Sequence, residues 1–122
     1  FAYQNEAAFA ELINAIIENT VEYLLGQIEA GVDAVQLFDS WAGSLSPAQF
    51  EKWVIAPNAE IIARLKAVHP DLPIIGFPKG AGAKLVAYAN ETGAWMKRSI
   101  RSGPMKTCRS ICRCRAISIR WR

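Results

Sequence analysis

Two short segments combine polar side chains with glycines. One reads Asp39-Ser40-Trp41-Ala42-Gly43 and the other Pro78-Lys79-Gly80-Ala81-Gly82. A serine hydroxyl can donate a hydrogen bond to a ligand, and a lysine among glycines suits an anion because backbone N–H groups and the ammonium group point the same way. The glycine spacing differs from that of a Walker motif, so nucleotide binding is disfavoured. Ser40 and Lys79 are therefore candidate ligand-binding residues, with a capped loop and a solvated lysine as the alternatives.

The neighbours of Ser40 allow further interpretations. Nucleophilic catalysis by Ser40 would need a base, and the only histidine, His69, is expected at the opposite end of the strands. Asp39 could hold a polar ligand group or cap the loop, and the sequence favours neither. Trp41 could stack on a flat ligand, although packing against the protein is the more frequent role of an aromatic residue after a strand. A Ser-His pair is therefore not expected.

Both segments follow apolar runs that suit buried strands. The spacing of apolar residues predicts helices around these runs, because it recurs at steps of three and four. Ser46, Pro47 and Gln49 mark a helix start with a capping box, and Pro57 should interrupt that helix. The predicted helices cover 6–30, 46–68 and 83–90, and the predicted strands cover 32–38 and 72–77.

This order of elements predicts the α/β class. Strands joined by helices form parallel sheets, either doubly wound or closed into a (β/α)8 barrel, and functional groups then gather after the carboxyl ends of the strands. Two strands are too few for either sheet. The helix-strand-helix-strand-helix pattern therefore indicates a slice of a larger domain.

Charge divides the chain near residue 94. The 122 residues carry a net charge of +3, but residues 1–94 hold all 11 acidic and only five basic side chains. Residues 95–122 hold nine basic side chains, no acidic ones and all three cysteines. No signal peptide, disulfide framework or apolar stretch of about 18 residues is present, so we expect no membrane span and a cytoplasmic protein.

The basic tail, residues 95–122, permits two functional interpretations. An arginine-rich arm could bind nucleic acid through its phosphates. The spacing of Cys108, Cys112 and Cys114 could hold a metal ion, but a fourth ligand is missing. Neither a nucleic-acid partner nor a metal site is favoured.

One family resemblance is specific. Residues 26–43, followed by Leu45-Ser46-Pro47 and Phe50, resemble uroporphyrinogen decarboxylases of the bacterial kind, and residues 75–82 are similar to the next strand and loop of that family. The resemblance covers about residues 1–94. It implies a partial (β/α)8 TIM-barrel domain over 1–94, from a homodimeric enzyme.

The resemblance also implies an activity. Enzymes of this family convert the four acetate side chains of uroporphyrinogen III to methyl groups, which gives coproporphyrinogen III, and they use no cofactor. Ser40 matches a serine that contacts the substrate, Phe38 is expected to line the same cavity, and Lys79 is a further candidate. A corrinoid-dependent methyltransferase of the same superfamily is an alternative, but its zinc ligands are absent from residues 1–94.

The family's remaining functional residues have no counterpart in this sequence. Its N-terminal arginines, central aspartate, tyrosine and C-terminal histidine all lie outside the chain. Because a decarboxylation barrier is lowered by such groups acting together, we expect no catalytic residue in this fragment and no turnover by the isolated chain.

Residues 95–122 depart from the family altogether. The nine residues 114–122 can be written in codons whose neighbouring frame reads Met-Gln-Gly-Asn-Leu-Asp-Pro-Met-Ala, a string similar to the family beyond this point. A frameshift just after Ala94 is therefore predicted, with 95–122 as a non-family tail. We expect this tail to be disordered or irregular and the barrel strand after Gly93 to be missing.

Overall fold

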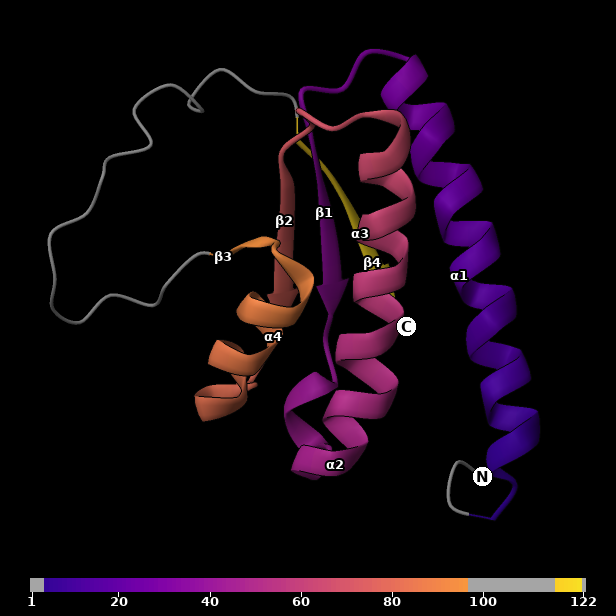
Figure 1. The fold of residues 1–122 in the computed structure, drawn as a ribbon, viewed down its shortest axis with the longest axis vertical. Coiled ribbons are helices and arrows are strands. Elements are labelled where there is room, and N and C mark those ends of the chain that lie inside the picture. Colours follow the sequence, from indigo (N-terminus) through magenta and orange to yellow (C-terminus); the bar gives the residue numbers. More distant parts are fainter. Residues whose placement is uncertain (1–3, 97–115, 122) are drawn as a thin grey trace, which may run out of the picture.

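The computed structural model describes residues 4–96 and 116–121 (Figure 1). In chain order the elements are α1 (Glu6–Glu29), β1 (Ala34–Asp39), the 3₁₀ turn η1 (Ala42–Ser44), α2 (Pro47–Phe50), the π-helical segment η2 (Glu51–Ile55), α3 (Ala56–Val68), β2 (Ile74–Pro78), the 3₁₀ turn η3 (Gly82–Lys84), α4 (Leu85–Thr92), β3 (Trp95–Met96) and β4 (Ala116–Trp121). The predicted alternation of helices and strands is confirmed.

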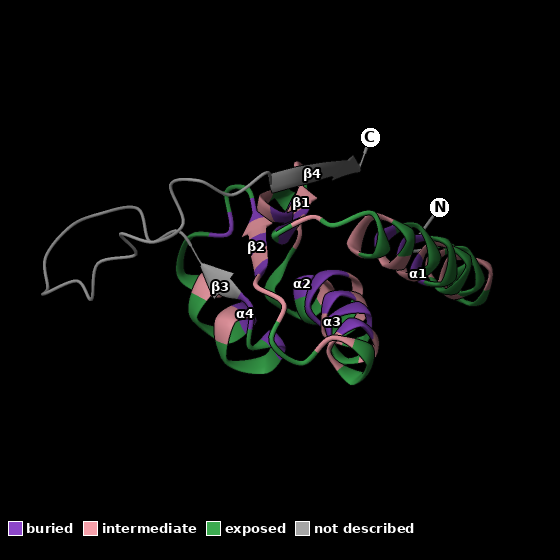
Figure 2. Ribbon diagram, turned by 90° about the horizontal axis from the view of Figure 1, so that it is seen from above, coloured by how far each residue is buried: buried purple, intermediate pink, exposed green. Residues whose placement is uncertain are grey.

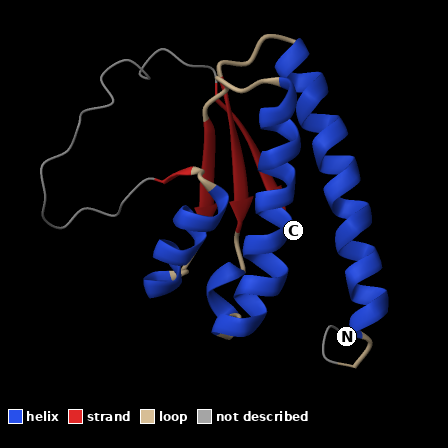
Figure 3. Ribbon diagram, in the orientation of Figure 1, coloured by secondary structure: helices blue, strands red, loops and turns tan. Residues whose placement is uncertain are grey.

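The strands form one parallel sheet, in the order β3-β2-β1-β4 (Figure 3). Seen from above, α3 and α4 lie on the same side of this sheet and α1 lies beside α3 (Figure 2). Phe38 pairs with Phe77 and Asp39 with Pro78, so β1 and β2 end at the same level. The two segments that follow them therefore meet at one edge of the sheet.

The core lies between the sheet and its helices. Val35, Leu37 and Ile74 are each at most 1% exposed, and they pack with Phe50 and Leu65 from the helical side. The intervening strand residues are less deeply buried, as expected when successive side chains point to opposite faces. Within the described residues, only one face of the sheet carries helices (Figure 2).

The second predicted helix begins and breaks where its sequence indicates. The Ser46 hydroxyl accepts from the Gln49 N–H at 3.4 Å, with Pro47 in the first turn. The capping box is incomplete, because the Gln49 side chain accepts from the Trp53 indole instead of turning back to Ser46. Pro57 lacks an N–H and its ring crowds the preceding turn, and the chain passes through η2 just before it.

The third helix, in contrast, begins later than predicted. Residues 82–84 form η3, so α4 covers Leu85–Thr92 and not 83–90. Gly93 ends α4 in the left-handed conformation, with φ of 61°. Such a conformation favours glycine, which has no Cβ to clash.

After Ala94 the described residues differ from the prediction. We expected no strand after Gly93 and an irregular tail, but two short strands are present. Trp95–Met96 pairs with β2, and Ala116–Trp121 pairs with β1 in parallel over its full length. A short slice of a parallel sheet leaves open hydrogen-bonding edges, and the isoleucines of 116–121 favour the strand conformation. Residues 97–115 lie outside the described residues.

Candidate functional site

The two segments predicted to bind ligand lie against each other beyond the carboxyl ends of β1 and β2. We call residues 39–45 and 78–82 the rim loops. The Lys79 N–H donates to the Asp39 carbonyl at 2.8 Å, and the Gly43 N–H donates to the Lys79 carbonyl at 3.0 Å. These hydrogen bonds continue the pairing of β1 and β2 beyond the ends of the strands. Ser40 and Lys79, each the first residue after its strand, therefore lie at the same level.

Two glycines allow the rim loops to approach so closely. A Cβ atom on Gly43 would lie 2.5 Å from the Gly80 carbonyl oxygen, a distance that real Cβ contacts do not reach. Gly80 has φ of 74°, a conformation that side chains disfavour. The backbone contact therefore requires glycine at position 43, and the positive φ favours glycine at position 80.

Ser40, a predicted ligand-binding residue, lies between β1 and the 3₁₀ turn η1. It is the first residue after β1, and its side chain is half-buried. The Asp39 carboxylate, not the Ser40 hydroxyl, caps the loop, because it accepts from the Trp41 N–H at 3.0 Å. Among the described residues, the Ser40 hydroxyl has no hydrogen-bond partner, so it is available to a ligand.

Phe38 lies two residues before Ser40, near the carboxyl end of β1. Its ring stacks on that of Phe77, with the centroids 4.7 Å apart and the planes 18° apart. The two rings form an apolar floor next to the rim loops. Phe77 was not among the candidate residues, although its equal position in the second predicted strand could have indicated this pairing.

Lys79 and Trp41 both extend from the rim into solvent. Lys79 is exposed, and in the described part of the chain no partner of its ammonium group is found. Trp41 is 73% exposed, so the expectation that it packs against the protein is wrong within the described residues. The Trp41 side chain is instead mostly exposed to solvent, and Trp41 directly follows Ser40 in the sequence.

His69 lies away from these residues, as expected. It follows α3 and borders a hollow of about 380 Å³ with Asp33 and Asp71, near the start of the strands. Ser40 follows the carboxyl end of β1. A Ser-His catalytic pair is therefore excluded by the direction of the strands.

Two further residues near the rim, Tyr88 and Lys84, are not predicted by any pattern in the sequence. Tyr88 is 1% exposed and its ring lies against Gly76, where a Cβ would be 2.6 Å from the ring. Burial raises the pKa of the Tyr88 phenol, and the charge of Asp39 raises it further. The Lys84 ammonium group contacts the loop after Ser40. Neither residue stands within a motif, so only the tertiary structure identifies them.

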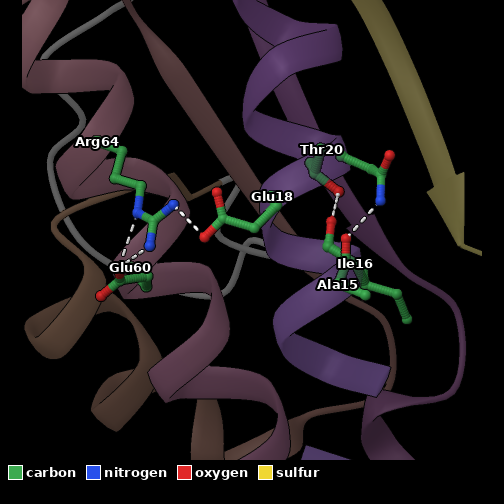
Figure 4. Close-up of polar contacts among 7 residues, drawn as sticks. Ala15, Ile16, Glu18, Thr20, Glu60 and Arg64 are labelled. Atoms are coloured by element: carbon green, nitrogen blue, oxygen red, sulfur yellow. Dashed lines mark hydrogen bonds and ion pairs between the residues drawn. The ribbon is translucent and has the colours of Figure 1, made fainter. Parts of the chain in front are cut away.

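A second hollow, of about 550 Å³, lies between α1 and α3. Arg64 of α3 spans it to Glu18 at 2.6 Å and pairs with Glu60 at 2.8 Å (Figure 4). These hydrogen bonds, first to Glu18 and then to Glu60, raise the pKa of Arg64, which is charged in any case. Exposed ion pairs of this kind contribute little to stability. The described residues that line the hollow form no recognisable catalytic or metal-binding set.

The described residues contain neither a candidate metal site nor a membrane-spanning helix. No group of three or more His, Cys, Asp or Glu side chains is placed to hold a metal ion. None of the helices in 4–96 is long and apolar enough to cross a membrane. The cysteines of the tail lie in 97–115, outside the described residues.

The fold defines the chain as part of a parallel α/β protein whose rim loops meet beyond the carboxyl ends of neighbouring strands. Comparison with known protein families identifies the family within this class. The family model for uroporphyrinogen decarboxylase (URO-D) matches residues 1–97, and the chain belongs to this family. The resemblance seen in the sequence is thereby confirmed.

Curated relatives agree with this result. The chain is 74% identical to a uroporphyrinogen decarboxylase of Sphingopyxis alaskensis and 64% identical to one of Rhizorhabdus wittichii, each over 92 residues that are 75% of the chain. It is 52% identical over 93 residues to one of Mesorhizobium japonicum. The chain spans about 27% of the length of these relatives. The comparisons favour neither the nucleic-acid-binding module nor the corrinoid methyltransferase.

Proposed function

We propose that this chain is a section of a uroporphyrinogen decarboxylase. The whole enzyme would be a (β/α)8 barrel and a homodimer of the cytoplasm, and would convert uroporphyrinogen III to coproporphyrinogen III without a cofactor. The observation that carries the proposal is the rim itself. In a chain of this family, the Ser40 hydroxyl and the Lys79 ammonium group stand beyond neighbouring strand ends, and neither has a partner among the residues that the structure describes.

The chemistry of the rim suits a substrate with several carboxylates on pyrrole rings. The Ser40 hydroxyl would donate to a substrate carboxylate, and the Lys79 ammonium group would attract another. The stacked rings of Phe38 and Phe77 offer an apolar aromatic surface, which would contact a pyrrole ring of the substrate. These residues would bind and orient the substrate, and we assign no catalytic residue to this chain.

The same proposal predicts that the 122-residue chain does not turn over uroporphyrinogen by itself. A single serine and a single lysine cannot supply the preorganised charges that lower a decarboxylation barrier. Turnover by the purified chain would contradict this expectation, and it would be detected by separating the products according to their number of carboxylates.

A chimaera tests the binding role directly. The 92 matching residues of the Sphingopyxis alaskensis relative would be replaced by those of this chain, and the product measured as above. We expect the chimaera to be active and Ser40→Ala to lower its kcat/KM by about 10- to 100-fold, the effect of one hydrogen bond to a charged group.

Ser40→Thr is the matched control, because it keeps a hydroxyl donor at the same position. It should retain most of the activity. A folded chimaera without turnover, or a Ser40→Ala variant as active as its parent, would overturn the proposed role of the rim.

A further inference from the structure

Lys84 makes contacts that neither the sequence motifs nor the family assignment account for. It is the last residue of η3, directly before α4, and its side chain is half-buried. Its Nζ donates to the Leu45 carbonyl at 2.6 Å and to the Gly43 carbonyl at 3.2 Å. The same Nζ lies 4.9 Å from the centroid of the Phe50 ring. An ammonium group has three donors, and this arrangement gives two of them to a single loop.

The loop that Lys84 contacts packs on the core through Ala42 and Leu45 and has few hydrogen bonds to the rest of the chain. Within residues 39–45 the backbone makes two short-range turns, from the Ser44 N–H to the Trp41 carbonyl and from the Leu45 N–H to the Ala42 carbonyl. Its links to the second rim loop both run through the Lys79 backbone. The Lys84 side chain therefore supplies the connection between this loop and the start of α4.

Charge and burial make the connection strong. Hydrogen bonds from an ammonium group to carbonyl oxygens are stronger than neutral ones, and the nearby face of Phe50, which is 1% exposed, favours a cation. Phe50 belongs to α2 and packs toward Tyr88 of α4, with ring centroids 6.4 Å apart. One ammonium group thus ties the loop to both helices that flank it.

We propose that Lys84 is a positioning residue, which fixes residues 42–45 against the second rim loop and so sets the place of the Ser40 hydroxyl. The part of this inference that concerns Ser40 rests on the proposed function. The clamp itself concerns only the geometry of the loop, and it is tested without a substrate.

The test uses the full 122-residue chain with nitrogen-15 at its eight glycines. Amide hydrogen exchange is then measured at Gly43, which reports on the loop through its bond to Lys79, and at Gly31 and Gly93, which end α1 and α4 with hydrogen bonds of 2.9 and 3.1 Å. Lys84→Met should accelerate exchange at Gly43 by about tenfold or more. Exchange at Gly31 and Gly93 should change by less than about twofold.

Lys79→Met is the matched control. It removes an ammonium group from the same rim but leaves the backbone bond of Gly43, so exchange at Gly43 should be unchanged. Lys84→Gln provides a second variant in case Lys84→Met fails to fold, because an amide can still donate to one carbonyl. It should give an intermediate acceleration at Gly43.

The possible outcomes are distinct. Unchanged exchange at Gly43 in Lys84→Met, or a Gly43 amide that is unprotected in the original chain, would overturn the clamp. Loss of protection at all three glycines in both variants would also overturn it, because Lys84 would then support the whole fold. An inactive chimaera with a protected Gly43 would instead contradict the proposed function and leave the clamp intact.

Discussion

At the scale of single residues, the rim depends on backbone proximity more than on side chains. Gly43 and Gly80 lie so close that a methyl group on Gly43 would overlap the Gly80 carbonyl. Ser40 and Lys79 owe their common location to that contact and to the two backbone hydrogen bonds beside it. A substitution at Gly43 should therefore displace Ser40 and Lys79, although Gly43 itself has no side chain that could contact a ligand.

We predict that Gly43→Ala lowers the free energy of unfolding by about 1–3 kcal/mol, because the backbone of the second rim loop must shift to admit a Cβ. Urea denaturation of the full chain measures the effect. Gly26→Ala is the control, since Gly26 lies within α1 with nothing within 4 Å of its added Cβ. That substitution should stabilise the chain by about 0.5–1 kcal/mol. Equal effects of the two substitutions would contradict the close approach of the loops.

At the scale of elements, the interrupted helix between β1 and β2 shows how one proline shapes its surroundings. Pro57 stands in the first turn of α3, and the chain before it is π-helical. Asn58 is only 9% exposed, and its side chain donates to the Val54 carbonyl at 2.7 Å. A buried carbonyl at an irregular turn is thereby kept hydrogen-bonded, which removes a substantial desolvation cost.

Asn58→Ala should therefore destabilise the chain by about 1–3 kcal/mol. Asn19 offers a control of the same type, because its side chain donates to the Ala15 carbonyl at 2.6 Å, also four residues back, but in an exposed position. Asn19→Ala should change the free energy of unfolding by less than about 0.5 kcal/mol, since water replaces the lost bond. Thermal or urea denaturation distinguishes the two, and a large effect at Asn19 would argue against burial as the cause.

At the scale of the whole molecule, the chain has two parts of different composition. Residues 1–94 hold all 11 acidic side chains, whereas 95–122 carry nine basic side chains and no acidic ones. The charge of +3 is therefore a sum over a part with net charge −6 and a part with +9. The strand that residues 116–121 form beside β1 requires only an open edge and apolar residues, and it is compatible with a tail that was never selected for this fold.

The nucleotide sequence tests this interpretation. We predict that the frame joining the last base of each codon to the first two bases of the next encodes Met-Gln-Gly-Asn-Leu-Asp-Pro-Met-Ala along residues 114–122. Sequencing the coding region on both sides of Ala94 supplies the measurement. A neighbouring frame that does not continue the decarboxylase sequence would exclude a frameshift and would return the basic tail to consideration as a functional segment.

The sequence by itself determined the family, the alternation of helices and strands, the helix start at Ser46, the interruption near Pro57 and the candidate residues Ser40 and Lys79. These features depend on local periodicity, on capping groups or on a contiguous motif, all of which are present in the linear chain. Only the tertiary structure decided what surrounds them. It stacked Phe38 on Phe77, exposed Trp41, assigned the loop cap to Asp39 and brought Lys84 to Gly43 across 41 positions of sequence. Such contacts follow from strand register and helix packing, which no local pattern encodes.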